Sequence, residues 1–191
     1  MFMLALVLAG VAVMQAAAQQ ATVELTPASY TVPNVGLAFN VNVTVGDVEN
    51  LYGYEFKLFY SKDILNGTSV TEGSFLKTGG VSTFFFVANF TDNYNATHGY
   101  VHVSATRMGN VSGANGTGTL ATVSFKSVST DGPRILHLAD VKLSDPDSTA
   151  IPFAAVDGEV TVLPEFPAAL IPALLAALSL VAVGLSRKTG E

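Results

Sequence analysis

Residues 52–60 read YGYEFKLFY, and this stretch decides the fold class of the chain. Apolar and aromatic side chains occupy every second position from Tyr52 to Tyr60, and Glu55 and Lys57 stand between them. Successive side chains of a β-strand point to opposite faces, so a period of two is typical of a half-buried strand. The stretch predicts a strand whose aromatic side packs in a core and whose other side meets solvent.

The same alternation recurs along the chain. LAFNVNVTV at residues 37–45 alternates in the same way. Segments rich in Asn, Gly, Asp, Ser and Thr, such as NGTS at residues 66–69, separate the candidate strands as turns. No amphipathic soluble helix is evident. We therefore expect an all-β sandwich, with further strands at 82–89, 100–106, 120–127, 135–143 and 159–163.

The first 18 residues form an apolar segment that ends in Ala16-Ala17-Ala18. Such a segment is too short to span a bilayer, and small residues at its end suit a signal peptidase. We predict a signal peptide over 1–18, cut after Ala18. The alternative is a first core strand or helix.

The C-terminal segment holds twenty residues without a charge, from Phe166 to Leu185. As a helix it would extend about 30 Å, the thickness of a bilayer core. Arg187 and Lys188 follow and are expected on the cytoplasmic side. We predict an ectodomain over 19–163 outside the membrane, a linker and transmembrane helix over 164–186, and a basic tail over 187–191; a buried core helix is the alternative.

The ectodomain is acidic and lacks cysteine. Fourteen Asp and Glu residues stand against seven Lys and Arg between Gln19 and Glu165, without a basic cluster. This balance argues against nucleic acid as a partner. The absence of cysteine excludes disulfides and thiolate metal sites.

Six Asn-x-Ser/Thr sequences are possible glycan acceptors in an exported chain. Asn and Thr are also common in turns, so the motif alone does not prove modification. Asn42 lies inside a strand pattern and is the less favourable site. The six acceptors are Asn42, Asn66, Asn89, Asn95, Asn110 and Asn115.

Three segments in order resemble cohesin domains. VTVGDVENLYGYEFKLFYSKDIL (43–65) is similar to the cohesin turn and following strand, although Ser61-Lys62 replaces the usual Asp-Pro. GTGTLATVSFKSV (116–128) and GPRILHLADVKLSDPDSTAIPFAAVDGEVTV (132–162) resemble the family's later strands. The resemblance implies a jelly-roll β-sandwich of about nine strands that docks other proteins. Cohesins bind calcium-loaded helical modules called dockerins, and related sandwiches bind carbohydrate.

Pro164-Glu165-Phe166, the apolar segment and the basic tail resemble the C-terminal sorting signals of archaeal surface proteins. The resemblance implies cleavage near the tripeptide by a membrane transpeptidase and transfer to another anchor. The alternative is a rigid linker to an uncleaved helix, because proline favours an extended chain.

No catalytic constellation is recognisable, and we expect no enzyme activity, cofactor or metal. His98, His102 and His137 lack the spacing of a metal pair on a helix, and His102 and His137 are interpreted as solvent-facing strand residues. No Ser lies in a nucleophile elbow. Two acidic groups could offer oxygens to calcium, but neither follows an EF-hand pattern. These groups are Asp140, Asp145 and Asp147, and Asp47 with Glu49.

By analogy with cohesins, we predict a protein-binding face over residues 55–60, 84–87 and 100–106. In TFFFVANF, Phe85 would be exposed if Phe84 and Phe86 were internal; the strand could instead be an open edge, or be covered. A carbohydrate-binding module and a self-associating envelope protein are the alternatives. The predicted binding residues are Glu55, Lys57, Phe59, Phe85, Val87, His102 and Ser104.

Overall fold

The computed structural model describes residues 20–92 and 94–164, which form two packed β-sheets. Five long strands carry most of the framework: β3 (Ala38–Leu51), β4 (Gly53–Ser61), β7 (His98–Arg107), β8 (Ala114–Ser127) and β9 (Asp131–Ser144). The shorter elements are β1 (Ala21–Thr26), β2 (Ser29–Val32), β5 (Leu65–Glu72), the 3₁₀ turn η1 (Phe75–Lys77), β6 (Thr83–Val87), β10 (Phe153–Val156) and β11 (Gly158–Val162).

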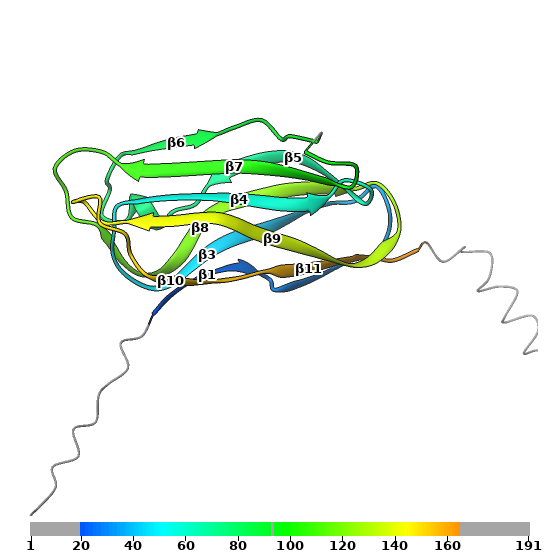
Figure 1. Cartoon of the computed structure of the whole chain (residues 1–191), viewed down its shortest axis with the longest axis horizontal. Coiled ribbons are helices and arrows are strands. Elements are labelled where there is room, and N and C mark those ends of the chain that lie inside the picture. Colours follow the sequence, from blue (N-terminus) through cyan, green and yellow to red (C-terminus); the bar gives the residue numbers. More distant parts are fainter. Residues whose placement is uncertain (1–19, 93, 165–191) are drawn as a thin grey trace, which may run out of the picture.

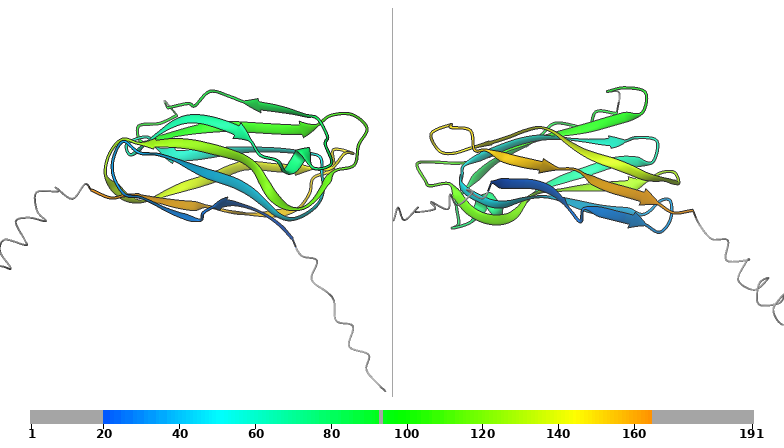
Figure 2. Two further views of the ribbon diagram at one scale, coloured as in Figure 1. Left: turned by 180° about the vertical axis from the view of Figure 1, so that it is seen from behind. Right: turned by 60° about the horizontal axis from the view of Figure 1, so that its bottom comes forward.

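The two sheets lie face to face (Figures 1 and 2). One has five strands in the order β10-β1-β3-β8-β5, and the other has six in the order β2-β11-β9-β4-β7-β6. The prediction of an all-β sandwich is confirmed.

The described residues contain eleven strands, two more than the nine or so expected, because both ends of the domain change sheets. β1 and β10 belong to the five-stranded sheet, whereas β2 and β11 belong to the other. Pro27, which has no N–H to donate, separates β1 from β2. Asp157 separates β10 from β11 and accepts a hydrogen bond from the Leu138 N–H on β9 (2.8 Å).

The alternation in β4 is confirmed. Tyr54, Phe56, Leu58 and Tyr60 are buried between the sheets. The Tyr54 hydroxyl donates to the Leu120 carbonyl (2.7 Å), and burial raises the pKa of Tyr54. The Tyr54 hydroxyl therefore has a hydrogen-bond partner inside an apolar core.

Among the residues that the structure describes, the hydrophobic core runs from Ala21 to Val162. The eleven described strands lie in the same interval and pair with one another. A domain of this size buries enough apolar surface to be stable by itself. We therefore expect the fragment 20–164 to fold alone.

β5 corrects one interpretation of the sequence. Its residues NGTS were assigned to a turn, yet they form an edge strand paired with β8. A register shift between Gly67 and Ser69 accommodates them, and the Thr68 hydroxyl bonds the Ser124 carbonyl across the strands (3.0 Å). The preference of these residues for turns is outweighed here, because the long strand β8 provides hydrogen-bond partners for the β5 backbone.

The predicted terminal segments lie outside the described residues. These are the signal peptide (1–18), Glu165 and Phe166 of the sorting tripeptide, the membrane helix and the basic tail. Pro164 is described and follows β11. Among residues 20–92 and 94–164, no helix is long and apolar enough to cross a membrane.

The six glycan acceptors differ in accessibility. Asn66, Asn89, Asn95, Asn110 and Asn115 are exposed. Asn42 is half-buried and accepts a hydrogen bond from the Thr122 hydroxyl (2.7 Å). Their modification stays a prediction, with Asn42 the least accessible.

Candidate functional site

The outer surface of β9, β4, β7 and β6, called here the outer face, gathers most of the predicted binding residues. Glu55, Lys57 and Phe59 point outward from β4, opposite to the buried positions of that strand. In the register with β7, Lys57 pairs with His102 and Phe59 with Tyr100. The strand pairing therefore aligns charged side chains toward one end of the face and aromatic ones toward the other.

A bulge in β9 completes this arrangement. Glu55 pairs with Lys142 and Lys57 with Ala139, so β9 has an extra residue between two β4 partners. Asp140 lies in this bulge with a positive φ of 50°, a conformation that Asp tolerates better than most residues. The extra residue changes the parity of β9 and places both Asp140 and Lys142 beside β4.

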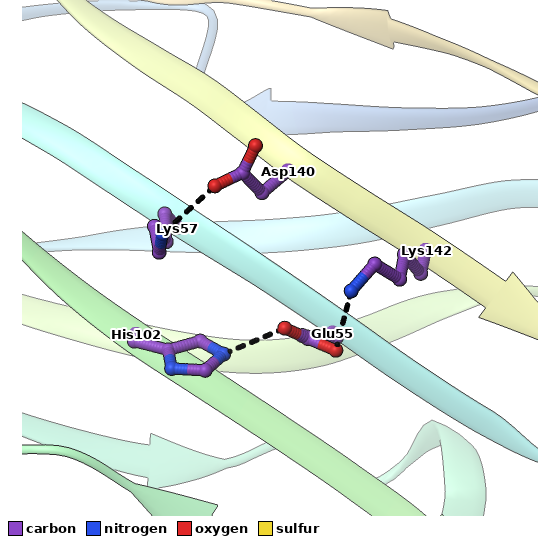
Figure 3. Close-up of polar contacts among 5 residues, drawn as sticks. All are labelled: Glu55, Lys57, His102, Asp140 and Lys142. Carbon is purple, nitrogen blue, oxygen red and sulfur yellow. Dashed lines mark hydrogen bonds and ion pairs between the residues drawn. The ribbon is translucent and has the colours of Figure 1, made fainter.

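The polar side chains of the outer face form two separate groups of contacts (Figure 3). One group is centred on Glu55, and the other is the pair of Lys57 and Asp140. Glu55 accepts from Lys142 Nζ (3.2 Å) and from His102 Nε2 (3.0 Å). Lys57 Nζ donates to Asp140 Oδ2 (2.8 Å). Acidic and basic groups thus alternate across three neighbouring strands.

These contacts favour the charged forms of Glu55, Lys57 and Asp140. The hydrogen bond from Lys142, with a further one from His102, holds the pKa of Glu55 below its ordinary value. The hydrogen bond between Lys57 and Asp140 raises the pKa of the lysine and lowers that of the aspartate. At neutral pH this part of the face carries a fixed pattern of opposite charges.

The lowered carboxyl pKa values predict that part of the stability is lost in acid. The contribution of Glu55 and Asp140 is complete above the ordinary carboxyl pKa of about 4 and disappears as the pH falls through the lowered values. We expect the Tm of the wild type to fall more steeply below about pH 5 than that of Glu55→Gln/Asp140→Asn. Thermal unfolding followed by circular dichroism measures this difference.

Asn also tolerates a positive φ, so the change at position 140 removes charge with little backbone strain. Glu159→Gln, at an exposed position on β11, is the control and should leave the curve unchanged. Parallel Tm curves for the wild type and the double variant would show that these ion pairs do not contribute to folding.

A hollow of about 640 Å³ adjoins the ion pairs on the outer face. The rings of Phe59 and Tyr94 meet edge to face with centroids 4.9 Å apart, and Tyr100 lies 5.3 Å from Phe59. His137 Nδ1 lies 2.7 Å from Asp157 Oδ2 at the rim. The lining residues are Lys57, Phe59, Tyr94, His98, Tyr100, Ile135, His137, Ala139, Asp140 and Asp157.

The structure reverses the orientation considered for β6. Phe84 and Phe86 are exposed (60 and 48%), whereas Phe85 and Val87 pack against the core. Phe85 and Val87 are therefore not exposed interface side chains. The alternation was visible in the sequence, but three consecutive phenylalanines do not indicate which parity is internal.

The outer face brings together five of the seven predicted binding residues: Glu55, Lys57, Phe59, His102 and Ser104. Sequence reasoning missed four neighbours. The bulge hid Asp140 and Lys142, Tyr94 comes from a loop, and His137 was interpreted only as a solvent-facing strand residue. For His137, one signal was available: it lies two residues after Ile135 on β9, so both side chains share a face of the strand.

Two of the acidic residues considered for calcium, Asp140 and Asp145, have partners within the fold, and Asp140 pairs with Lys57. Asp145 Oδ1 accepts from the N–H groups of Asp147 (2.9 Å) and Thr149 (2.8 Å), which closes a turn. Within the described parts of the chain, no group of three or more metal-binding side chains is assembled.

Comparison with known proteins gives the family. The sequence model described as the cohesin domain matches residues 23–162, which include nearly the whole sandwich. The chain belongs to the cohesin family. This assignment is consistent with a binding module and supports the prediction that the protein is not an enzyme. A search of curated proteins found no match.

Solved cohesin structures share the fold. A non-cellulosomal cohesin from Archaeoglobus fulgidus is 17% identical with a TM-score of 0.58, over 76% of this chain and 92% of that one. A type I cohesin–dockerin complex from Clostridium thermocellum is 12% identical with a TM-score of 0.61, over 76% and 100%. A cohesin from Clostridium acetobutylicum is 18% identical with a TM-score of 0.59, over 75% and 91%.

Proposed function

We propose that this cohesin is a non-catalytic docking module that binds a protein partner through its outer face. The observation that carries the proposal is the alignment of ion pairs and an aromatic hollow on three paired strands. Because these side chains project from a rigid sheet, binding costs little ordering of the receptor. Solved structures similar to this chain include complexes of cohesins with dockerins, which supports a protein ligand.

The partner is another surface or secreted protein, and a dockerin-like helical module is the first candidate. A helix can place charged side chains over the pairs formed by Glu55 and Lys57 while an apolar or aromatic side chain enters the hollow. The site requires no cofactor on the cohesin side. An acidic domain without a basic patch does not suit nucleic acid.

The proposed location is the outside of the cell membrane. The apolar segments at 1–18 and 166–185 support export and C-terminal anchoring, and the tripeptide 164–166 supports sorting to another anchor. Protease treatment of intact cells tests this location, since an outward ectodomain would be digested without lysis. Protection of the ectodomain in intact cells would contradict it.

The docking function is tested by affinity capture with the fragment 20–164 from a membrane and envelope extract. We expect mass spectrometry to identify one protein retained by the wild type, and retention of a dockerin-like partner to be lost in a chelator. A column that carries the Glu55→Lys fragment should lose the partner, because the change lies on the outer face. A column that carries the Glu24→Lys fragment should retain it, because that change lies on the opposite sheet. Equal retention on all columns, or capture of polysaccharide alone, would contradict the proposal.

Carbohydrate binding is the second candidate function, because aromatic rings and polar groups meet in the hollow. Sugar rings present apolar faces that pack against exposed aromatic side chains. Tyr94→Ala would weaken sugar binding strongly, whereas Glu55→Lys would affect a protein ligand more. Titration of both variants with envelope polysaccharide separates the two functions.

A further inference from the structure

β6 forms an open edge of the six-stranded sheet. It pairs with β7 without a register shift and has no strand on its other side among the described residues. Figure 1 shows it at the margin of the sandwich. Natural edge strands are ordinarily protected by charge, proline or a bulge, but the sequence TFFFV has none of these. This edge is therefore competent to pair with another strand.

The hydrogen bonds that flank β6 identify the free backbone groups. Met108 N–H donates to the Ser82 carbonyl (2.9 Å), and Ala88 N–H donates to the His102 carbonyl (3.0 Å). Bonded and non-bonded pairs alternate in an antiparallel ladder, so the even-numbered residues of β6 face β7. Thr83, Phe85 and Val87 then direct their N–H and C=O groups to the open edge.

The sequence of β6 is complementary to itself in one antiparallel register. With Phe85 opposite Phe85 of a second copy, Thr83 lies opposite Val87 and all three free residues pair. Phe84 then lies opposite Phe86 at a non-hydrogen-bonded position, where side chains are closest. Both rings are exposed, so their mutual contact would remove apolar surface from water.

Charge makes β6 an edge at which a second copy meets little repulsion. The described domain is acidic overall, so two copies repel each other at most surfaces. The strand TFFFV carries no charge, and pairing along it opposes no like charges. β6 thus offers an uncharged contact on an otherwise acidic surface.

We propose that two copies of this chain associate through β6 and join their six-stranded sheets into one continuous sheet. The symmetry axis is perpendicular to the sheet, because identical residues oppose each other on the same face. Both outer faces consequently lie on the same side of the dimer. A partner with two docking modules could then bind both faces and gain avidity.

The test is the mass in solution of the full chain in detergent and of the fragment 20–164, measured by light scattering after size exclusion. We expect the wild type to have twice the monomer mass and Phe84→Lys/Phe86→Lys to be monomeric. Val156→Lys, at an exposed apolar position on the edge strand β10, is the matched control and should remain dimeric. A monomeric wild type, or a dimeric lysine variant, would overturn the proposal.

A backbone variant gives a second measure. Thr83→Pro removes an N–H that points to the open edge, so the β7 ladder is kept while two bonds of the dimer are lost. We expect this variant to dissociate without a change in its circular dichroism spectrum. Hydrogen exchange should show protected amides at Phe85 and Val87 in the wild type and fast exchange in the monomeric variants. Fast exchange at Phe85 in a wild-type dimer would place the interface elsewhere and refute β6 pairing.

Discussion

Phe125→Ala is expected to reduce the free energy of unfolding of the domain by about 3–5 kcal/mol. Phe125 lies on β8, is completely buried and packs against rings from three other parts of the chain. Its centroid is 5.2 Å from Tyr60, 5.8 Å from Phe39 and 6.4 Å from Phe90. Removal of the ring leaves a cavity that these neighbours cannot fill together. Urea unfolding of the fragment 20–164 measures the loss.

Phe125→Leu is the matched variant, because it keeps an apolar side chain of intermediate size and should cost clearly less. Val128→Ala, at an exposed position just beyond β8, should change stability by no more than about 0.5 kcal/mol. If Phe125→Ala were as stable as Val128→Ala, the ring would not be a central contact between the two sheets.

Glu55→Lys is expected to weaken capture of the protein partner at least about tenfold. Glu55 accepts hydrogen bonds from two cationic or polar partners, Lys142 and His102. A lysine in its place removes both bonds and adds a positive charge beside Lys142 and Lys57. The charge pattern of the outer face would be reversed at its centre. Surface plasmon resonance with the captured partner measures the change.

Two variants separate recognition from stability. Glu24→Lys makes the same charge change on β1, in the opposite sheet, and should leave binding unchanged. Glu55→Lys/Lys142→Glu restores an ion pair within the domain but exchanges its polarity. We expect this swap to recover the Tm without recovering binding. Recovery of binding by the swap would mean that Glu55 only supports the fold.

The sequence was sufficient for the framework of the sandwich. A strand with one buried face leaves a period of two, and β4 was predicted correctly because its buried positions carry large aromatic residues. β5 was missed because its interior residues are small and polar, which is also the composition of turns. Edge strands have one neighbour and few buried side chains, so their sequences carry a weaker pattern.

The candidate site likewise contains some residues that the sequence predicted and others that only the structure brings there. Glu55, Lys57 and Phe59 were predicted by analogy with cohesins, and the alternation of β4 accounts for their common outward direction, since residues two apart share a face. Asp140 and Lys142 could not be assigned, because a bulge in β9 changes which residues face outward. Tyr94 contacts Phe59 from a loop that lies far from β4 in the sequence. The position of Asp140 and Lys142 beside β4 and the contact of Tyr94 with Phe59 both join residues far apart in the sequence, so no local sequence pattern predicts them.

By itself, the amino-acid order determined that this chain is a β-sandwich, that Tyr54, Phe56 and Tyr60 of β4 face inward, and that no cysteine supports the fold. These properties follow from local alternation and composition. Only the tertiary structure decided that Phe85 faces the core, that β6 is an open edge, and that Asp140 reaches Lys57. Those outcomes depend on register and bulges between strands distant in sequence, because hydrogen bonds to a neighbouring strand set which side of each residue faces outward.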